Sequence, residues 1–297
     1  MKASVIIPAY NCLPNLKRTL NSLQKQDLSP AEFEVIVIDD GSDDGTDEFL
    51  KTYRSRIQLK PIINDKNSGR AVSRNKGIEA AEGENIVFLD ADMETGPDFL
   101  RTHLNFRNDP PRATVGRVIL HPDIKKTGLM KYLDKRGGAK LPGGSRIPGK
   151  YFLSCNSSVP LDILRKTGGF DEGFKEYGGE DLELGLRIAG QIPIYFVPEA
   201  ITFHNHQRNM DQYFAIYRKY GEYSIPYLVK KHPDVLKDLR LDNIPAKNFT
   251  DLFTAFACSS PIYNSIKMLA KLDKVPDFIY SYLVFRNYRD GYLRSMR

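Results

Sequence analysis

Glu84-Asn85-Ile86-Val87-Phe88-Leu89-Asp90-Ala91-Asp92 is the stretch that decides the fold of this 297-residue chain. Its four consecutive large apolar residues predict a strand that is buried on both faces, as in a parallel sheet. The strand ends in two carboxylates, and a carboxylate is rarely buried without water, a hydrogen bond or a cation. Ligands of α/β sheets bind at this carboxyl end of the strands. Asp90 and Asp92 are therefore predicted either to hold a divalent cation together with substrate phosphates or to cap a turn.

The composition indicates a globular protein of roughly two domains, or one large α/β domain with an appendage. Hydrophobic residues make up 41% of the chain, which is enough for a core. Cys12, Cys155 and Cys258 are far apart, which argues against a disulfide framework or structural zinc site and for a reducing compartment. We expect Cys155 to be a core thiol. No secretory signal and no run of 18 apolar residues is visible, so the sequence predicts a cytoplasmic protein without a membrane span.

The positive net charge lies toward the C-terminal end. Residues 1–200 hold 28 Lys and Arg and 28 Asp and Glu, so the whole excess of six positive charges lies in residues 201–297. A basic, aromatic region can bind anionic lipid headgroups, a phosphorylated substrate or nucleic acid, and scattered charge can also form a solvated helix surface. Because no nucleic-acid recognition motif accompanies the charge, we expect no nucleic-acid partner.

Three further apolar runs precede the opening stretch. The first predicts a strand over residues 4–8 that ends at Pro8, because proline cannot donate to the ladder, and a helix over 14–26 follows it. The others predict strands over 34–38 and 62–63, and a helix over 71–81 leads to the fourth strand. Strands that alternate with helices predict parallel pairing with right-handed crossovers, and therefore a doubly wound, nucleotide-binding sheet.

The strand tips carry chemistry that common nucleotide motifs do not explain. The chain has no G-x-G-x-x-G after its first strand and no P-loop, which argues against a dinucleotide dehydrogenase or a P-loop enzyme. The tips supply an aromatic ring for a base, carboxylates for a base, ribose or cation, and guanidinium groups for a diphosphate. Singly, each residue could also cap a turn or be a surface charge. These residues are Tyr10, Asp39, Asp40, Arg70, Arg74, Asp90 and Asp92.

Together these motifs resemble glycosyltransferase family 2, the inverting enzymes with the GT-A fold. The resemblance covers residues 4 to about 204. It implies a nucleotide-diphosphate sugar donor, most often a UDP-sugar, and a divalent metal at the D-x-D sequence. The motifs that carry it are Val5-Ile6-Ile7-Pro8-Ala9-Tyr10-Asn11, Val37-Ile38-Asp39-Asp40-Gly41-Ser42, Arg70 with Arg74-Asn75-Lys76-Gly77, and Asp90-Ala91-Asp92.

The resemblance also implies roles for single residues. Pro8, Tyr10 and Asp40 would contact the nucleobase, with Asp39 close by. Arg70 would lie near the diphosphate, Asp90 would touch the ribose or the sugar, and Asp92 would ligate the metal. The neighbouring residues of these motifs are assigned to the same nucleotide-sugar site, namely Asn11, Asn67, Arg74 and Ala91.

A second group of polar residues follows Gly178 and Gly179, whose backbone can approach a ligand closely. Glu180 and Asp181 then occupy the first turn of a predicted helix, where the helix dipole favours an ionised carboxylate. They resemble the E-D motif of family 2 and of the galactosyltransferase-like C-terminal segment. We expect Asp181 to be the general base and Glu180 to contact an acceptor or sugar hydroxyl. Glu183 and Arg187 are expected to form a helix-surface pair.

His204 ends the second of two short predicted strands, over residues 194–197 and 200–204. A lone histidine is more often structural than a ligand, and we apply that interpretation to His206. His204, however, falls within one residue of the metal-binding histidines of related glycosyltransferases. An aspartate, an imidazole and diphosphate oxygens favour Mn²⁺ over Mg²⁺.

We therefore predict a GT-A catalytic domain over residues 1–206, with a donor half over 1–105 and an acceptor and metal half over 106–206. A helical C-terminal extension over 207–297 follows, with helices over 211–232 and 248–272 and a last basic, aromatic segment from Phe278 to Arg297. That segment could contact the inner face of a membrane, pack on the catalytic domain, or pair with a second copy of the chain as a homodimer.

The expected activity is transfer of a hexosyl or N-acetylhexosaminyl group to a hydroxyl of a saccharide or lipid-linked saccharide, in polysaccharide or glycoconjugate synthesis. Two other functions stay open. A sugar-1-phosphate nucleotidyltransferase shares the sheet and the metal, but it should carry a Gly-rich basic loop after the first strand, where this chain has residues 8–12. A non-catalytic nucleotide-sugar-binding protein would bind UDP without turnover.

Overall fold

The computed structural model describes residues 1–106, 110–135, 140–205, 208–242 and 260–297. It divides into two compact units. The first comprises Met1–Ile124, Asp134–Lys175 and Glu180–His206, and the second comprises Lys125–Leu133, Glu176–Gly179 and Gln207–Arg297. The second unit thus includes two short segments that precede residue 207 in the chain.

The first unit is built on a sheet of nine strands with the order β3-β2-β1-β4-β8-β6-β9-β5, and β7 also pairs with β9. Its first four strands are parallel, as the alternating pattern predicted. Each is a continuous apolar run between polar loops, so each can be buried on both faces. These strands are β1 (Ala3–Ala9), β2 (Phe33–Asp39), β3 (Gln58–Ile63) and β4 (Asn85–Leu89).

Strand β1 continues through Pro8 to Ala9, so the prediction that Pro8 ends the strand is wrong. The carbonyl oxygen of Ala9 accepts a hydrogen bond from the backbone N–H of Asp40, on the β2 side. The backbone hydrogen-bonding groups of successive residues in a strand point alternately to the two neighbouring strands. The backbone nitrogen of Pro8 therefore points toward β4. Pairing with β4 has already ended there at Ile6, so the missing N–H of proline removes no ladder bond.

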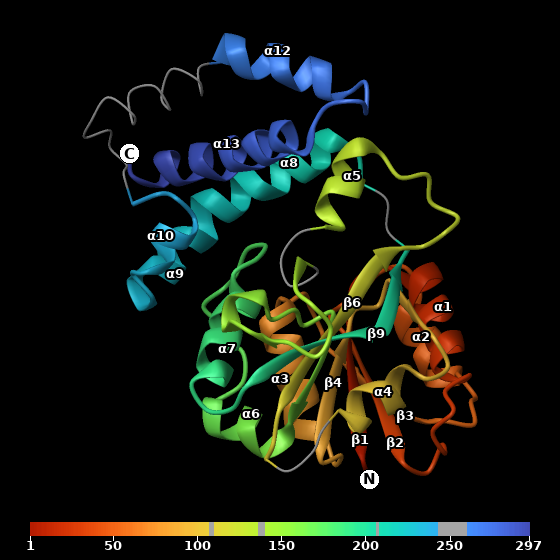
Figure 1. Cartoon of the computed structure of the whole chain (residues 1–297). Coiled ribbons are helices and arrows are strands. Elements are labelled where there is room, and N and C mark those ends of the chain that lie inside the picture. Colours follow the sequence, from red (N-terminus) through yellow and green to blue (C-terminus); the bar gives the residue numbers. More distant parts are fainter. Residues whose placement is uncertain (107–109, 136–139, 206–207, 243–259) are drawn as a thin grey trace. The chain divides into compact units, whose positions relative to one another are not determined.

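Helices cover both faces of this sheet and form two separate cores (Figure 1). On one face, α1 (Leu13–Leu23), α2 (Thr46–Thr52) and α4 (Phe99–Asn105) pack on alternate residues of β1, β2 and β4. On the other face lie α3 (Arg70–Ala80), α6 (Leu161–Thr167) and α7 (Glu180–Ala189). A Cβ atom on Gly77 would lie 2.6 Å from Ile6, so glycine lets α3 lie close against β1.

The remaining strands extend the sheet with mixed pairing. Strand β8 lies antiparallel between β4 and β6, and β9 is parallel to β6. Residues 194–204 form the single strand β9, so the prediction of two short strands is wrong. The added strands are β5 (Met93–Thr95), β6 (Ala113–Leu120), β7 (Arg146–Ile147), β8 (Asn156–Pro160) and β9 (Ile194–His204), and a 3₁₀ turn spans Gly149–Tyr151.

The second unit is helical. Its core consists of apolar side chains of α5, α8, α12 and α13, among them Leu129, Phe214, Ala270 and Leu283. Of the predicted helix over 248–272, the structure describes residues from Ser260 onward, and these are helical to Ala270. The described elements are α5 (Gly128–Leu133), α8 (Met210–Lys219), a π-helix (Tyr220–Ser224), α9 (Ile225–Lys231), α10 (Val235–Asp238), α12 (Ser260–Ala270) and α13 (Asp277–Ser295).

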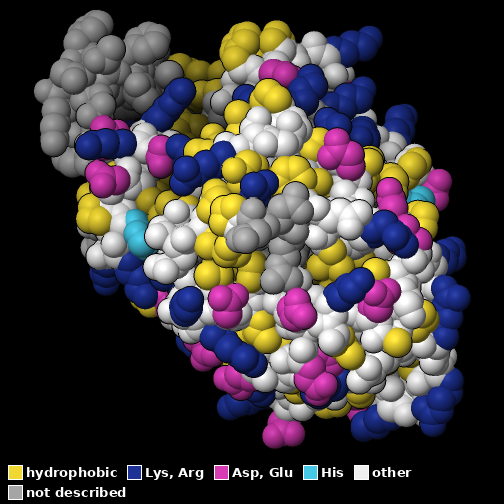
Figure 2. All heavy atoms as spheres, turned by 60° about the horizontal axis from the view of Figure 1, so that its bottom comes forward, with side chains coloured by type: hydrophobic (Ala, Val, Ile, Leu, Met, Phe, Trp, Pro, Cys, Tyr) yellow, Lys and Arg dark blue, Asp and Glu magenta, His cyan; other side chains and the backbone are white. Residues whose placement is uncertain are grey.

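Two surface properties bear on function. Among the described residues, no helix is long and apolar enough to cross a bilayer. On the face shown in Figure 2, Lys and Arg side chains are interspersed with Asp and Glu side chains.

His206, for which the sequence predicts a structural role, lies outside the described residues, as do parts of the loops after α4 and α5.

Candidate functional site

Asp90 and Asp92 follow β4 at the carboxyl edge of the parallel strands. Between them, Ala91 is buried and its carbonyl oxygen accepts a hydrogen bond of 2.8 Å from Oγ1 of Thr19 in α1. The side chains of Asp90 and Asp92 are 32% and 22% exposed. The hydrogen bond from Thr19 therefore fixes the backbone of this turn, while both carboxylates stay accessible to a ligand.

His204 lies beside Asp92. Residues 93–95 form strand β5 directly after Asp92, and β5 pairs antiparallel with the end of β9, so that Met93 lies opposite His204. The Nε2 atom of His204 is 3.1 Å from Oδ2 of Asp92, and the backbone N–H of Asn205 donates to the carbonyl oxygen of Asp92. The pairing of two strands thus brings an imidazole to a carboxylate.

The donor set of this pair fits a divalent cation that is also held by a substrate. Among the residues that the structure describes, no group of three or more His, Cys, Asp and Glu side chains could hold a metal ion. One carboxylate and one imidazole supply two ligands, and diphosphate oxygens and water can supply the others.

The loop after β1 is fixed to the loop after β2. Asn11 has a φ of 48°, and its Oδ1 atom accepts from the backbone N–H of Asp43, while its own N–H donates to Oγ of Ser42. Asparagine tolerates this left-handed conformation better than most residues. Tyr10 precedes it and is 50% exposed. Its ring is therefore presented at the edge of the sheet on a loop that is held in place.

Asp39 and Asp40 are both buried, and both accept hydrogen bonds from the neighbouring loops. Oδ1 of Asp39 accepts from Ser42, and Asp40 accepts from the backbone N–H groups of Ser68 and Gly69 at 2.9 Å each. These bonds shape the loop that leads into α3. Oδ2 of Asp39 has no hydrogen-bond partner among the described residues, which leaves a buried acceptor for a ligand to satisfy.

The other residues that were predicted to bind the donor lie along the same edge. Asn67 precedes α3 and is exposed, Arg70 is the first residue of that helix and is also exposed, and Pro8 is partly buried near the end of β1. A guanidinium at a helix N-terminus adds its charge to the unpaired backbone N–H groups, and this combination favours an anion such as a diphosphate.

Arg74 differs from Arg70, although both lie on α3. Its side chain is 2% exposed, and its Nη2 atom is 2.9 Å from Oδ1 of Asp90. Its Nη1 atom lies 3.5 Å from Oε1 of Glu180 and 3.9 Å from Oδ1 of Asp181. The interpretation of Arg74 as a surface charge is therefore wrong. The structure brings the D-x-D turn and the E-D motif together around one buried cation.

Asp181 lies in the first turn of α7, where Oγ of the buried Ser154 donates a hydrogen bond of 2.5 Å to its Oδ1 atom. Burial and the neighbouring charge of Glu180 raise the pKa of Asp181 to about 6, against the opposing effects of Arg74 and Ser154. The helix dipole, which the sequence predicts to favour the ionised form, is therefore not the dominant effect, because burial favours the protonated form. A carboxylate with this pKa can accept a proton near neutral pH.

The other acidic residues of α7 are buried. Glu180 is 7% exposed, and its Oε2 atom has no hydrogen-bond partner among the described residues. Glu183 is 4% exposed and forms a two-pronged ion pair with Arg187, so the prediction of a helix-surface pair is wrong. Arg187 also donates to the carbonyl oxygens of Thr167 and Gly169, and thereby fixes the turn between α6 and the site.

A buried polar network behind the site was missed by sequence reasoning. Nε2 of His103 lies 2.9 Å from Oδ1 of Asn156, and the amide nitrogen of Asn156 donates to the carbonyl oxygens of Arg117 and Ala200. Burial lowers the pKa of His103 to about 4, so the imidazole is neutral. Asn156 thus fixes the irregular stretch where β6 and β9 shift register, upstream of His204.

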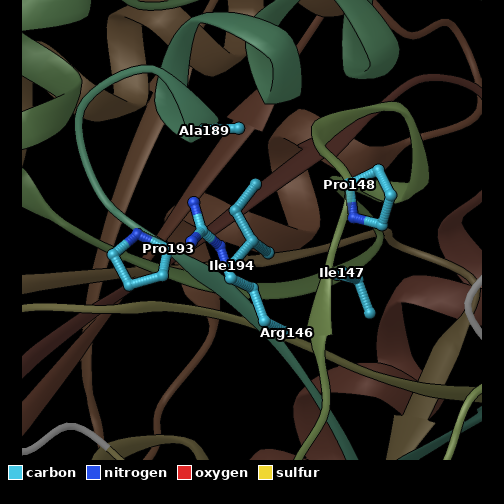
Figure 3. A pocket seen from close by; sticks show the side chains of 6 residues that line it. All are labelled: Arg146, Ile147, Pro148, Ala189, Pro193 and Ile194. Atoms are coloured by element: carbon cyan, nitrogen blue, oxygen red, sulfur yellow. The ribbon is translucent and has the colours of Figure 1, made fainter.

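Two further features have no assigned role in the reaction. Cys155, which was predicted to be a core thiol, is only partly buried and packs against one core of the first unit, and burial raises the pKa of its thiol well above the usual range. A pocket of about 280 Å³ lies at the carboxyl end of α7, whereas Glu180 and Asp181 lie at its amino end (Figure 3). Its lining residues are Arg146, Ile147, Pro148, Ala189, Pro193 and Ile194.

Family comparisons cover most of the first unit. The family model described as glycosyl transferase family 2 matches residues 4–155, and the model described as the N-terminal domain of galactosyltransferase matches residues 142–207. Validoxylamine A glucosyltransferase of Streptomyces hygroscopicus subsp. limoneus is 29% identical over 270 residues, which cover 80% of this chain and 58% of the relative. The chain spans about three fifths of the length of such relatives.

Solved structures show the same architecture. The mannosyltransferase PcManGT of Pyrobaculum calidifontis, solved with GDP-Man and Mn²⁺, has a TM-score of 0.64 at 20% identity and covers 97% of this chain and 86% of that one. TarS residues 1–349 of S. aureus, solved with UDP-GlcNAc, has a TM-score of 0.59 at 18% identity and covers 100% and 91%. These likenesses establish the GT-A fold.

Proposed function

The chain belongs to glycosyl transferase family 2, and on this premise we propose that it is an inverting, metal-dependent glycosyltransferase. It would move a sugar from a nucleotide-diphosphate sugar to a hydroxyl group of an acceptor. One observation carries the proposal: Asp90 and Asp92 both follow β4, Asp92 lies beside His204 at the end of β9, and Asp90 and Asp181 both lie within 4 Å of Arg74. Groups suited to a leaving diphosphate and to an attacking hydroxyl therefore meet at one edge of the sheet.

The donor would bind along the loops after β1, β2 and β3. The exposed ring of Tyr10 can stack on the nucleobase, and the unpartnered Oδ2 atom of Asp39 can accept from a base N–H. Arg70 lies at the amino end of α3, where a diphosphate is favoured. A uracil base offers such an N–H donor, and UDP-GlcNAc is bound by TarS, so we propose a UDP-sugar donor.

The metal would be held by Asp92 and His204. Both side chains are partly exposed and close enough to share one ion, and a nitrogen ligand favours Mn²⁺ over Mg²⁺. The bound ion would stabilise the negative charge that develops on the departing diphosphate. PcManGT, solved with Mn²⁺, supports a metal of this class.

Asp181 would take the proton of the acceptor hydroxyl. General-base assistance of this kind contributes about 10²- to 10⁴-fold to a rate. Ser154 and Arg74 hold the carboxylate from two sides, so that it can face the acceptor in one orientation. We also propose that a sugar or acceptor hydroxyl donates to the unpartnered Oε2 atom of Glu180. A single displacement needs no covalent intermediate and inverts the anomeric centre.

The test is a panel of nucleotide-sugars incubated with and without MnCl₂, with slow donor hydrolysis as the readout. We expect hydrolysis of UDP-linked donors that needs Mn²⁺ and is lost in Asp92→Asn. The matched control is Asp162→Asn, because Asp162 follows β8 at the opposite edge of the sheet and its side chain is 66% exposed. UDP binding without any donor turnover would instead favour a non-catalytic nucleotide-sugar-binding protein.

A nucleotidyltransferase predicts a different product when the chain is given a nucleoside triphosphate and a sugar 1-phosphate in place of a nucleotide-sugar. It would release pyrophosphate from a nucleoside triphosphate and a sugar 1-phosphate, whereas the proposed enzyme releases a nucleoside diphosphate. The loop after β1 holds Tyr10 and Asn11 and no basic residue, so it offers no cation to a triphosphate there. The acceptor is proposed to be a saccharide or lipid-linked saccharide.

We further propose that the helical unit contacts an anionic membrane surface through α12 and the turn after it. In α13, Tyr280, Leu283 and Val284 are buried in the core of this unit. Met268, Leu269, Leu272 and Phe278, the last at the start of α13, are exposed apolar side chains, and Lys271, Asp273, Lys274 and Asp277 are exposed among them. Exposed apolar side chains with lysines among them suit a membrane surface.

Flotation with phosphatidylglycerol-containing vesicles tests this contact, with pure phosphatidylcholine vesicles as the comparison. Binding should be lost in Leu272→Glu and kept in Tyr223→Glu, which places the same charge at another exposed position of the helical unit. If Leu272→Glu instead converts a dimer to a monomer in solution without any effect on flotation, the group is a contact between two copies of the chain.

A further inference from the structure

Arg74 is among the most deeply buried charged side chains of the described structure. A buried guanidinium is costly unless carboxylates pair with it. Here the carboxylates of Asp90, Glu180 and Asp181 lie within 4 Å of the guanidinium. Asp90 is 16 residues from Arg74 along the chain, and the E-D motif begins 106 residues from it. Burial disfavours the charged form of Arg74, but these carboxylates outweigh burial and raise its pKa above the usual range.

The surroundings of Arg74 fix its position further. The guanidinium lies 5.3 Å from the centre of the Phe170 ring, which itself packs edge-on against Phe88 of β4. The next residue, Asn75, accepts from the backbone N–H of Phe170 at 2.8 Å and donates to its carbonyl oxygen at 2.9 Å. Helix α3 is thereby fixed against the segment that leads to α7.

We propose that Arg74 is a positioning residue that holds Asp181 and Asp90 in a fixed relation, so that acceptor and donor are aligned for transfer. The inference rests on the proposed function, because it assigns Arg74 to the support of the base and not to direct contact with the donor. Arg70, one helical turn earlier and exposed, is left as the arginine that meets the diphosphate.

The positive charge of Arg74 also favours the ionised form of the Asp181 carboxylate. The groups around Asp181 are Glu180 beside it, Asp90 at the end of β4, the neutral Cys155 thiol and the Ser154 hydroxyl, with Arg74 as the cation. Three carboxylates thus surround a single positive charge. Without Arg74, each remaining negative charge would oppose ionisation of Asp181, which would then be protonated at neutral pH.

The first experiment is a carboxyl ¹³C NMR titration of the full chain with labelled aspartate. The Asp181 resonance is identified by its loss in Asp181→Asn. In Arg74→Gln, the midpoint of Asp181 should rise by about one to three pH units, the effect of an opposite charge at this distance. In Arg74→Lys and in Arg70→Gln it should stay close to that of the unaltered chain. An unchanged midpoint in Arg74→Gln would overturn the proposal.

The second experiment is kinetic and separates alignment from charge. Lysine keeps the charge but cannot bridge two carboxylates with a planar fork, so Arg74→Lys should lower kcat by about 10- to 100-fold with little change in the donor KM. Arg70→Gln should mainly raise the donor KM. An Arg74→Lys variant with unaltered kcat, or one affected in donor KM alone, would contradict positioning.

These readouts also distinguish the two proposals. If the unaltered chain transfers no sugar, the proposed function fails, whereas the titration still decides whether Arg74 controls Asp181. If Arg74→Gln does not fold, Arg74→Lys keeps the kinetic test decisive. Thermal unfolding and UDP binding, measured on every variant, separate a general loss of structure from a change at the base.

Discussion

The Nε2 atom of His204 lies 3.1 Å from Oδ2 of Asp92, although 112 residues separate them. The two side chains are brought together by the pairing of β5 with the end of β9, which is a contact between distant parts of the chain. In the proposed enzyme, this imidazole and this carboxylate would supply two ligands to a divalent metal, and the diphosphate of the donor would supply others.

The two metal ligands should contribute unequally. Asp92→Asn removes the charged ligand and should weaken Mn²⁺ binding in the presence of UDP on the order of 100-fold. His204→Ala leaves the carboxylate and should cost about 10-fold, with a smaller loss in Mg²⁺ than in Mn²⁺ because Mg²⁺ prefers oxygen ligands. Electron paramagnetic resonance of free Mn²⁺ measures both. Equal effects of His204→Ala with the two metals would argue against the histidine as a ligand.

Asp181→Asn should abolish transfer and yet stabilise the protein. The native pKa of about 6 lies above the ordinary value of 3.8, so the native state favours the protonated form. The resulting penalty is absent below pH 4, grows as the pH rises to about 6, and is complete above it. Asparagine removes this penalty, and the free energy of unfolding at pH 7.5 should rise by about 1 to 3 kcal/mol.

Urea unfolding at pH 7.5 and pH 4 checks this stabilisation, since the gain should vanish at pH 4. Asp162→Asn, a change of the same chemistry at an exposed position, should show no such pH-dependent gain. A transfer rate that stays near that of the unaltered chain would refute the assignment of Asp181 as base.

The pH dependence of transfer should show an acid limb near pH 6. The base works as a carboxylate, and burial raises the pKa of Asp181 to about 6, so activity should fall as the pH drops through this value. In Ser154→Ala the carboxylate loses a hydrogen bond that favours its ionised form, and the limb should move to higher pH. Initial rates at saturating donor, measured with and without this substitution, provide the comparison.

His103 predicts a second pH effect, on stability alone. Burial holds its pKa near 4, below the ordinary value of 6.5, so the unfolded chain binds a proton in this window that the native state does not. Stability is therefore lost as the pH falls from 6.5 toward 4. In His103→Gln, which cannot be protonated, the drop between pH 7.5 and pH 5 should be smaller by about 2 kcal/mol. An equal drop in both proteins would show that His103 is not the titrating group.

The parallel half of the sheet was predictable because each of its strands is a local signal. The run before Asp90 forms β4 at Asn85–Leu89, and the helix expected over 71–81 is observed at Arg70–Ala80. A strand buried on both faces needs a continuous apolar run, and such runs are visible in the sequence. The contact of the D-x-D turn with the E-D motif through Arg74 was not among the predictions, and the roles assigned to the residues of both motifs stay predictions.

The features that were missed depend on contacts between distant residues. Arginine is rarely buried, so nothing in the sequence around Arg74 indicated that three carboxylates would surround it. Glu183 and Arg187 have the spacing of a surface pair, and only the packing of α7 buries them. The antiparallel placement of β8 between β4 and β6 brings Ser154 to Asp181, and a lone serine before a strand gives no sequence signal.

In the proposed enzyme, an ion held by Asp92 and His204 would hold the diphosphate of the donor. Isothermal titration of UDP into the unaltered chain, first with MnCl₂ and then after metal removal with EDTA, tests it most directly. We predict that the affinity for UDP falls at least about tenfold when Mn²⁺ is removed and that Asp92→Asn shows the weaker affinity under both conditions. Equal affinity of the unaltered chain for UDP with and without Mn²⁺ would contradict the claim.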